Sequence, residues 1–388
     1  MNFSRLQSII LATFLVTVLA ITPAAEACTG LRLIAKNDDV IVGRTMEFGF
    51  DVRSNVLVIP KKTNLTTTIN DEGKVGFTYQ TKHDIVGANV LDYDIIVDGI
   101  NDAGLYVSIH YFPGYASYPD LDSDGVSENK AMAPHEYATW LLAEFADVEE
   151  VKANFNKVSL LPVFIPDIDG PAQIHVVVHD VKGNSVVIEP IDKELKLFNN
   201  PLGVFTNSPS FDWHMTNLNN YVNLTLNNVP NVVLRTNSKP WILGSKDTEE
   251  HGFTLKQLGQ GSGLHGLPGD ITPPSRFVRA VAYSQGAIPP NKAQDGVPQV
   301  FHIMNAFDIP VGSARGPEGA DYTVWTSVSD LKNQDWYFRT YKDQTIRRIN
   351  LKKAIEKANG KMKYINMDNG LDYKQPFTDV SNEFFSPE

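Results

Sequence analysis

The stretch CTGLRLIAKNDDVIVGRTMEF, residues 28–48, contains two short runs of alternating apolar and polar residues around the turn signal KNDD. This pattern predicts a β-hairpin. The first residue of the hairpin, Cys28, is also the only cysteine in the chain. Because a single thiol cannot form a disulfide within the chain, Cys28 is either an inert, small hydrophobic residue or a reactive group.

The residues before Cys28 have the features of a secretory signal peptide. Arg5 precedes an apolar run over residues 9–21, and small residues stand at Ala25 and Ala27. The run is shorter than the roughly 20 residues of a membrane anchor, and Ala25 is not the large aliphatic residue of a lipoprotein signal. We therefore predict that residues 1–27 are removed and that the mature protein is periplasmic or secreted.

Cleavage after Ala27 makes Cys28 the first residue of the mature chain. An ordinary thiol has a pKa of about 8.5 and is mostly protonated at neutral pH. An N-terminal cysteine has its own base, because its α-amino group, with a pKa of about 7.7, lies within reach of the sulfur. The position of Cys28 at the predicted cleavage point therefore favours a nucleophile over an inert residue.

The rest of the chain predicts an α+β fold. Hydrophobic residues make up 42% and charged residues 20%, and the net charge of −11 argues against nucleic acid or an anionic membrane as a partner. No internal repeat or low-complexity linker is visible, so residues 28–388 are predicted to form one domain. Further strands are expected over 93–115, 172–190 and 195–209, and helices over 134–158 and 273–287. Residues 343–358 are read either as a helix or as a strand followed by a helix.

Two patterns resemble metal sites without completing them. Asp120, Asp122 and Asp124 match the opening of a calcium loop, but Ala131 stands where its bidentate glutamate belongs. A solvated acidic turn is the preferred interpretation, with calcium as the alternative. His175 and His179 are spaced as in zinc-binding helices, but the valines between them predict a strand, so two strand histidines are preferred over a zinc site.

Four segments together resemble the choloylglycine hydrolase family, which contains conjugated bile salt hydrolases and penicillin V acylases. They are the opening CTGLRL…GRTMEF, DGINDAGLYVSIHYFPGYASY (98–118), VFTNSPSFDWHMTNLNNY (204–221) and GLHGLPGDITPPSRFVRA (263–280). The resemblance runs in order from Cys28 to about Asn350. It implies the four-layer αββα sandwich of the N-terminal nucleophile hydrolases, a homotetramer, and no metal or organic cofactor.

The resemblance also assigns roles to individual residues. Cys28 matches the nucleophile, and Arg44 matches an arginine whose cation favours the thiolate. Glu47 stands where the family usually has aspartate, as the partner of the α-amino group and the sulfur. Asn207 matches the amide that donates to the oxyanion, and Arg276 matches a second active-site arginine.

Tyr111 bears on the substrate. It precedes FPG, where many bile salt hydrolases have asparagine and penicillin V acylases have tyrosine. Its backbone N–H would complete the oxyanion hole with Asn207. The nearby aromatic residues Phe112, Tyr115 and Tyr118 line the acyl pocket or belong to the core.

The implied activity is hydrolysis of linear amides by a cysteine nucleophile, with a small-molecule acyl amide as substrate. Penicillin V ranks first, and N-acyl homoserine lactones second, because the exported form and residues 322–326 resemble the Gram-negative branch of the family. Conjugated bile salts are the alternative. A non-enzymatic alternative is an exported lipoprotein or a ligand-binding module.

Overall fold

The hairpin that begins at Cys28 lies in one of two large antiparallel sheets. A computed structural model describes residues 28–235, 252–256, 263–316 and 319–368, so the predicted signal peptide lies outside the described residues. Strand β1 (Cys28–Ile34) pairs with β2 (Val40–Phe48), and Cys28 is opposite Met46. The predicted hairpin over residues 28–48 is therefore confirmed.

The hairpin occupies the middle of the first sheet. In spatial order the strands of this sheet are β16 (Val204–Phe205), β1, β2, β20 (Gly319–Asp330), β21 (Asp335–Thr340) and β22 (Arg347–Asn350), and β19 (Ala314–Gly316) pairs with β20. The second sheet consists of β15 (Glu194–Asn199), β14 (Ser185–Ile191), β13 (Ile174–Asp180), β8 (Leu105–Tyr111), β7 (Asp98–Asn101), β6 (Ile85–Ala88), β3 (Asn55–Ile59) and β23 (Lys363–Asn366). The strands expected over 93–115, 172–190 and 195–209 all lie in these two sheets.

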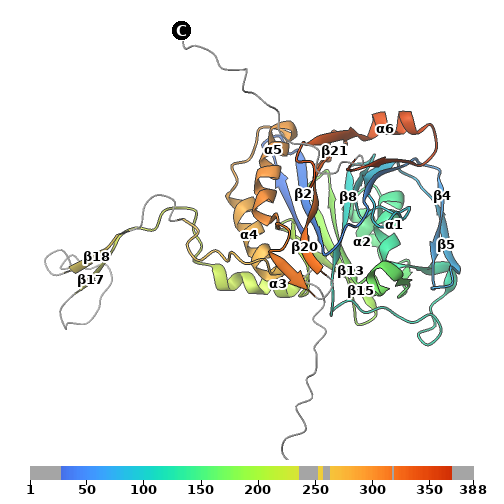
Figure 1. Ribbon diagram of the computed structural model, residues 1–388, viewed down its shortest axis with the longest axis horizontal. Helices are drawn as coiled ribbons and strands as arrows, with labels where there is room; N and C mark the ends of the chain where they lie inside the picture. The colour runs from blue at the N-terminus through green and yellow to red at the C-terminus, as the bar shows by residue number, and fades with distance from the viewer. Residues whose placement is uncertain (1–27, 236–251, 257–262, 317–318, 369–388) are drawn as a thin grey trace, which may run out of the picture.

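Four shorter strand pairs complete the strands of the described residues. They are β4 (Asn64–Thr68) with β5 (Val75–Gln80), β9 (Ala131–Met132) with β10 (Ser159–Leu160), β11 (Phe164–Ile165) with β12 (Gly170–Pro171), and β17 (Val232–Arg235) with β18 (Gly252–Leu255). In Figure 1 the β17–β18 pair lies well away from the two large sheets.

Helices cover the outer face of each large sheet. On the first sheet α4 (Pro273–Gly286) packs on β1 and α5 (Ala293–Met304) on β2, and on the second α1 (Tyr137–Glu144) packs on β7 and β8 and α2 (Val148–Asn154) on β13. Figure 1 shows the resulting order of helices, two sheets and helices. The predicted α+β fold, a four-layer αββα sandwich, is confirmed.

Two further helices and several turns of 3₁₀-helix lie around this sandwich. Helix α3 (Phe211–Asn217) packs beside α4, and α6 (Leu351–Ala358) packs against β3 and β22. The 3₁₀ turns are Glu128–Lys130, Pro134–Glu136, Pro166–Ile168, Leu218–Tyr221 and Asn305–Phe307. Within the part of the chain that the structure describes, no helix is long and apolar enough to cross a membrane.

The helical segment expected over residues 134–158 is interrupted. Phe145 has an extended backbone, with φ −117° and ψ 145°, and ends α1. The side chain of Asp147 then accepts a hydrogen bond from the N–H of Glu150 and caps α2. Because an N-cap aspartate satisfies an otherwise unpaired N–H of the first turn, the chain starts a second helix here rather than continuing the first.

Residues 343–358 form a strand followed by a helix, as in one of the two readings of the sequence. Strand β22 passes directly into α6 at Asn350, whose side chain accepts a hydrogen bond from the N–H of Lys353.

The acidic turn that contains Asp120, Asp122 and Asp124 is exposed, and protein groups bond its carboxylates. Asp120 accepts hydrogen bonds from Asp122 and Ser123, and Asp124 pairs with Lys193 at 2.7 Å. These contacts support the preferred interpretation of a solvated turn.

Strand β2 contacts its covering helix closely through Gly43. A Cβ atom at this position would lie 2.3 Å from Cγ1 of Val300 and 3.2 Å from Cγ of Met304. Both side chains belong to α5 and are fully buried. The absent side chain therefore sets how closely α5 approaches the first sheet, because a buried side chain on a helix has little room to move.

We expect Gly43→Ala to destabilise the protein by about 1–3 kcal/mol, because the added methyl group overpacks the contact with α5. Gly269→Ala is the matched control, since a Cβ atom there meets no atom within 4 Å. Urea unfolding followed by circular dichroism measures both. Equal stability of the two variants would contradict this account of the contact between β2 and α5.

Candidate functional site

Cys28 begins β1 and is buried, with 3% of its surface exposed. Its backbone nitrogen donates a hydrogen bond to Oδ1 of Asn207 at 2.7 Å. In the 388-residue chain this nitrogen belongs to the peptide bond with Ala27, and after the predicted cleavage it would be the α-amino nitrogen. The first residue of the predicted mature chain is therefore held in place from both its main chain and its side chain.

Arg44 lies beside the Cys28 sulfur, between the two sheets. Its Nη2 is 3.5 Å from Sγ of Cys28 and donates to the carbonyl oxygen of Ile109 at 2.8 Å, and Nη1 donates to that of Val97 at 3.1 Å. Burial by itself lowers the pKa of this guanidinium, but the Cys28 sulfur and the Asp98 carboxylate outweigh burial and raise it above its usual value. Arg44 is therefore a permanent cation next to the thiol.

Glu47 follows a β-bulge in β2 and is also buried. Its Oε1 accepts a hydrogen bond from the hydroxyl of Thr323 at 2.9 Å, whereas Oε2 has no partner among the described residues. Burial raises the pKa of the Glu47 carboxyl to about 8, against the opposing effect of the Arg276 cation. In the 388-residue chain this group is therefore mostly a neutral acid at pH 7.

Arg276, on α4, links Cys28 to Asn207. Its Nη1 donates to the carbonyl oxygen of Cys28 and, at 2.7 Å, to the hydroxyl of Thr29. Its Nη2 donates to Oδ1 of Asn207 at 2.7 Å. Burial lowers its pKa to about 10, so that it remains charged at neutral pH. The five residues assigned from the sequence to the catalytic machinery thus converge on one place.

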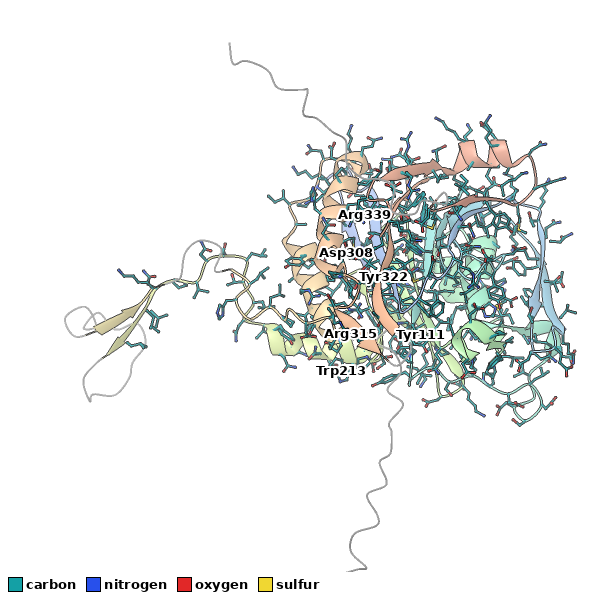
Figure 2. The ribbon with its side chains drawn as sticks, viewed as in Figure 1. Tyr111, Trp213, Asp308, Arg315, Tyr322 and Arg339 are labelled. Carbon is teal, nitrogen blue, oxygen red and sulfur yellow. The ribbon has the colours of Figure 1, made fainter. Side chains whose placement is uncertain are left out.

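Asn207 also bonds to the end of β8. Its Nδ2 donates to the carbonyl oxygen of Tyr111 at 2.9 Å, which uses one of its two N–H groups. Tyr111 is the last residue of β8 and is labelled in Figure 2. The two residues expected to form an oxyanion hole are therefore in direct contact.

A cavity of about 100 Å³ lies over Cys28, Arg44, Glu47 and Tyr111. The rest of its lining is mainly aliphatic and includes Val52, Leu91, Ile95, Val97, Ile109 and Ile174. The aromatic residues following Tyr111 do not line it. Phe112 is buried and stacks on His175 at 4.1 Å, so the core reading of this aromatic residue is correct.

Buried histidines support the segment that carries Asn207, and the sequence did not indicate this role. His110 Nδ1 and His175 Nε2 bond to the carbonyl oxygen of Thr206 at 3.0 and 3.1 Å. Burial lowers the pKa of both imidazoles, and Nδ1 of His175 also faces the Glu189 carboxyl at 3.0 Å. His175 is thus a strand histidine with protein partners, and within the described residues no group of His, Cys, Asp or Glu side chains is placed to hold a metal ion.

A third histidine acts on Asn207 itself. His214 on α3 donates from Nε2 to the carbonyl oxygen of Asn207 at 2.8 Å and stacks on Phe277 of α4. Both His110 and His214 lie in the quoted segments 98–118 and 204–221. Their presence was visible in the sequence, but the carbonyl groups that they bond were not, because these contacts join distant segments.

The neutral carboxyl of Glu47 makes stability depend on pH. Its pKa rises from 4.5 to about 8 on folding, so the folded protein binds more protons than the unfolded chain between these values. The stability that the neutral carboxyl contributes is complete below pH 4.5 and is lost as the pH rises toward 8. Across this pH interval the free energy of unfolding should fall in both proteins. Because Gln cannot ionise, we expect the fall to be about 2–4 kcal/mol smaller in Glu47→Gln than in the unsubstituted protein. Urea unfolding over the same pH range measures the difference, and parallel pH profiles would contradict it.

Comparison with known proteins places this arrangement in one family. The sequence pattern of the linear amide C–N hydrolases, choloylglycine hydrolase family, matches residues 28–362. A bile salt hydrolase/transferase from Clostridium perfringens is 33% identical over 329 residues, which are 84% of this chain and 93% of that protein. A bile salt hydrolase/transferase from Lactiplantibacillus plantarum is 30% identical over 327 residues, covering 84% of this chain and 92% of that protein.

Solved structures of related proteins support the same family. A mutant of conjugated bile acid hydrolase from Clostridium perfringens superposes with a TM-score of 0.72 at 32% identity, covering 88% of this chain and 97% of that one. Penicillin V acylase from Agrobacterium tumefaciens has a TM-score of 0.66 at 22% identity, covering 87% and 91%, which shows the shared fold alone. Over residues 28–362 this chain belongs to the choloylglycine hydrolase family of linear amide C–N hydrolases.

Proposed function

We propose that this family member uses Cys28 as its nucleophile, after removal of residues 1–27. The observation that carries the proposal is the position of the sulfur, which lies 3.5 Å from the buried guanidinium of Arg44 and lines the aliphatic cavity. The guanidinium is placed to bond to the sulfur in its charged form, which is the reactive form of cysteine. The cavity receives the acyl group of the substrate.

The reaction then follows from the groups around the sulfur. Sγ attacks the amide carbonyl carbon while the α-amino group of Cys28 takes the thiol proton. Asn207, with its remaining Nδ2 hydrogen, and the backbone N–H of Tyr111 stabilise the oxyanion. The protonated amino group passes its proton to the departing amine, leaving a thioester, and water activated by the same amino group releases the acid.

Arg276 and Glu47 act on this machinery rather than on the substrate carbonyl. Arg276 fixes the main chain of Cys28 and orients the Asn207 amide through Oδ1. The unpartnered Oε2 of Glu47 lines the same cavity as Cys28 and is suited to bond the new α-amino group. Glutamate therefore serves where the family usually has aspartate.

The comparisons change the order of substrates. The sequence analysis ranked penicillin V first. The two bacterial relatives described above, at 33% and 30% identity, are named for bile salts. The similarity to penicillin V acylase, at 22% identity, supports only the fold. We therefore propose conjugated bile salts as the main substrate class. Tyr111, which lines the cavity, favours penicillin V as the second. N-acyl homoserine lactones follow. Export to the periplasm or medium and a homotetramer remain proposals.

Replacing the nucleophile tests the proposed activity directly. We expect Cys28→Ala to abolish release of glycine or taurine from conjugated bile salts, and Cys28→Ser to be badly impaired because a hydroxyl ionises far less readily than a thiol. Circular dichroism checks that the variants fold.

Intact mass of the purified protein shows whether Cys28 is the free first residue or is lipidated, which separates the enzyme from a lipoprotein. Retention of more than about a tenth of the activity by Cys28→Ala would exclude cysteine catalysis.

Tyr111→Asn tests the order of substrates. The backbone N–H stays in place while the room and polarity beside the acyl group change. We expect the preference for phenoxyacetyl amides relative to bile-acid amides, expressed as the ratio of kcat/KM, to fall roughly 10-fold. An unchanged ratio would show that the Tyr111 side chain does not select the acyl group.

A further inference from the structure

The cavity over Cys28 is too small for the whole of a large acyl group. Its volume of about 100 Å³ compares with roughly 300 Å³ or more for sites that enclose a drug-sized ligand. Its aliphatic walls suit an apolar group next to the reacting carbonyl. A larger acyl group must therefore continue beyond this cavity.

A second cavity, of about 650 Å³, adjoins the first. It lies between the β4–β5 hairpin, the start of α1 and the strand β11, and its lining contains neither Cys28 nor Arg44. Four residues line both cavities and so form the junction between them: Tyr93, Ile95, His135 and Ile165. Three of them offer only carbon atoms or a phenol ring, and His135 adds an imidazole.

His135 has an unused hydrogen-bonding capacity at this junction. Its Nδ1 is buried without a partner, and no described residue bonds Nε2, which leaves Nε2 as the nitrogen for a ligand. The ring lies 5.5 Å from that of Tyr93. Nε2 can donate a hydrogen bond to a ligand group or accept one from it, depending on the tautomer of the ring.

We propose that the acyl group extends from Cys28 through the aliphatic cavity and past His135 into the second cavity, and that His135 bonds a neutral hydroxyl or carbonyl group on its distal part. This inference rests on the proposed amidase function. Within the proposed substrate class, it assigns recognition of the distal polar group to His135.

The charges around the junction favour a neutral group over a carboxylate. Burial lowers the pKa of His135 to about 4, so the imidazole is uncharged at neutral pH. The second cavity is lined by the carboxyl groups of Asp71, Asp94 and Glu136, and its described lining contains no lysine or arginine. Glu136 is occupied by the backbone N–H groups of Thr68 and Ala133. An acidic distal group would therefore meet only like charges.

The test compares acids that differ only in a distal hydroxyl. The probes are glycine conjugates of 5β-cholanic acid with and without its ring hydroxyl at the end remote from the amide, together with N-butanoylglycine, which is short enough for the first cavity. We expect the hydroxylated conjugate to have a kcat/KM about fivefold higher than its partner, in line with one buried neutral hydrogen bond. His135→Phe should remove this preference. Because the preference is a ratio of two substrates measured in the same variant, a general change in activity does not alter it, and butanoylglycine hydrolysis measures any such general change. His135→Asn, which retains a hydrogen-bonding side chain, should restore part of it.

His83→Phe is the matched control, because this histidine is paired with Asp102 and lines neither cavity. A preference that survives in His135→Phe, or one lost equally in His83→Phe, would overturn the proposal.

Binding separates this proposal from the proposed activity. Calorimetry with the free acids on Cys28→Ala, with and without His135→Phe, measures the hydroxyl preference without turnover. If no amide is hydrolysed yet the preference depends on His135, the activity is wrong and the acyl site stands. If amides are hydrolysed without any preference, the acyl site is wrong and the activity stands. Absence of binding by both acids would overturn the acyl site.

Discussion

The buried guanidinium of Arg276 connects the helical layer to the two segments that carry Cys28 and Asn207. Its hydrogen bonds reach the carbonyl oxygen of Cys28, the hydroxyl of Thr29 and the side chain of Asn207, whereas the residue itself belongs to α4. A buried cation that loses its partners is strongly destabilising. The fold at this end of the sandwich is therefore stable only when these segments meet in one arrangement, and that arrangement also positions the sulfur and the amide.

A second buried cation joins the two sheets. Arg44 on β2 bonds to carbonyl oxygens around β7 and β8, and its guanidinium lies 5.0 Å from the ring of Trp325. Asp98 contributes the opposing charge and is itself bonded by Ser327 and Trp336. In a region with little water these interactions are stronger than at a surface. The space between the sheets is consequently a rigid, charged support for Cys28 rather than a purely apolar core.

The site separates chemistry from substrate choice. Cys28 and Arg44 are on continuously paired strands, and Glu47 follows the bulge in β2. Buried histidines bond the backbone carbonyl groups of Thr206 and Asn207. The second cavity is instead formed by a short hairpin, a 3₁₀ turn and loop segments. Groups on regular elements can be held precisely, whereas loops can vary without disturbing them. Members of one family can thus share a reaction and differ in the acyl group they accept.

Local sequence patterns determined much of the architecture. Alternation and turn residues predicted the hairpin over 28–48 and the strand pairs over 93–115 and 172–190, and two prolines marked the start of α4. Helix α5 was not predicted, because Gly296 and Pro298 give it a weak intrinsic preference. Packing against β2 stabilises it nonetheless, and Gly296 allows Ile41 to approach. Such long-range packing outweighs local propensity and leaves no local signal.

The sequence also determined which residues are available for chemistry: one thiol at a predicted cleavage point, and the motif positions of Arg44, Asn207 and Arg276. The tertiary structure decided their partners, since Cys28 and Asn207 are 179 residues apart and yet share a hydrogen bond. It also decided the lining of the cavity, which is mainly aliphatic although aromatic residues follow Tyr111 in the chain. The physical reason is that periodicity and turn chemistry act between near neighbours, whereas the partner of a buried polar group depends on which distant segments meet when the sheets and helices pack.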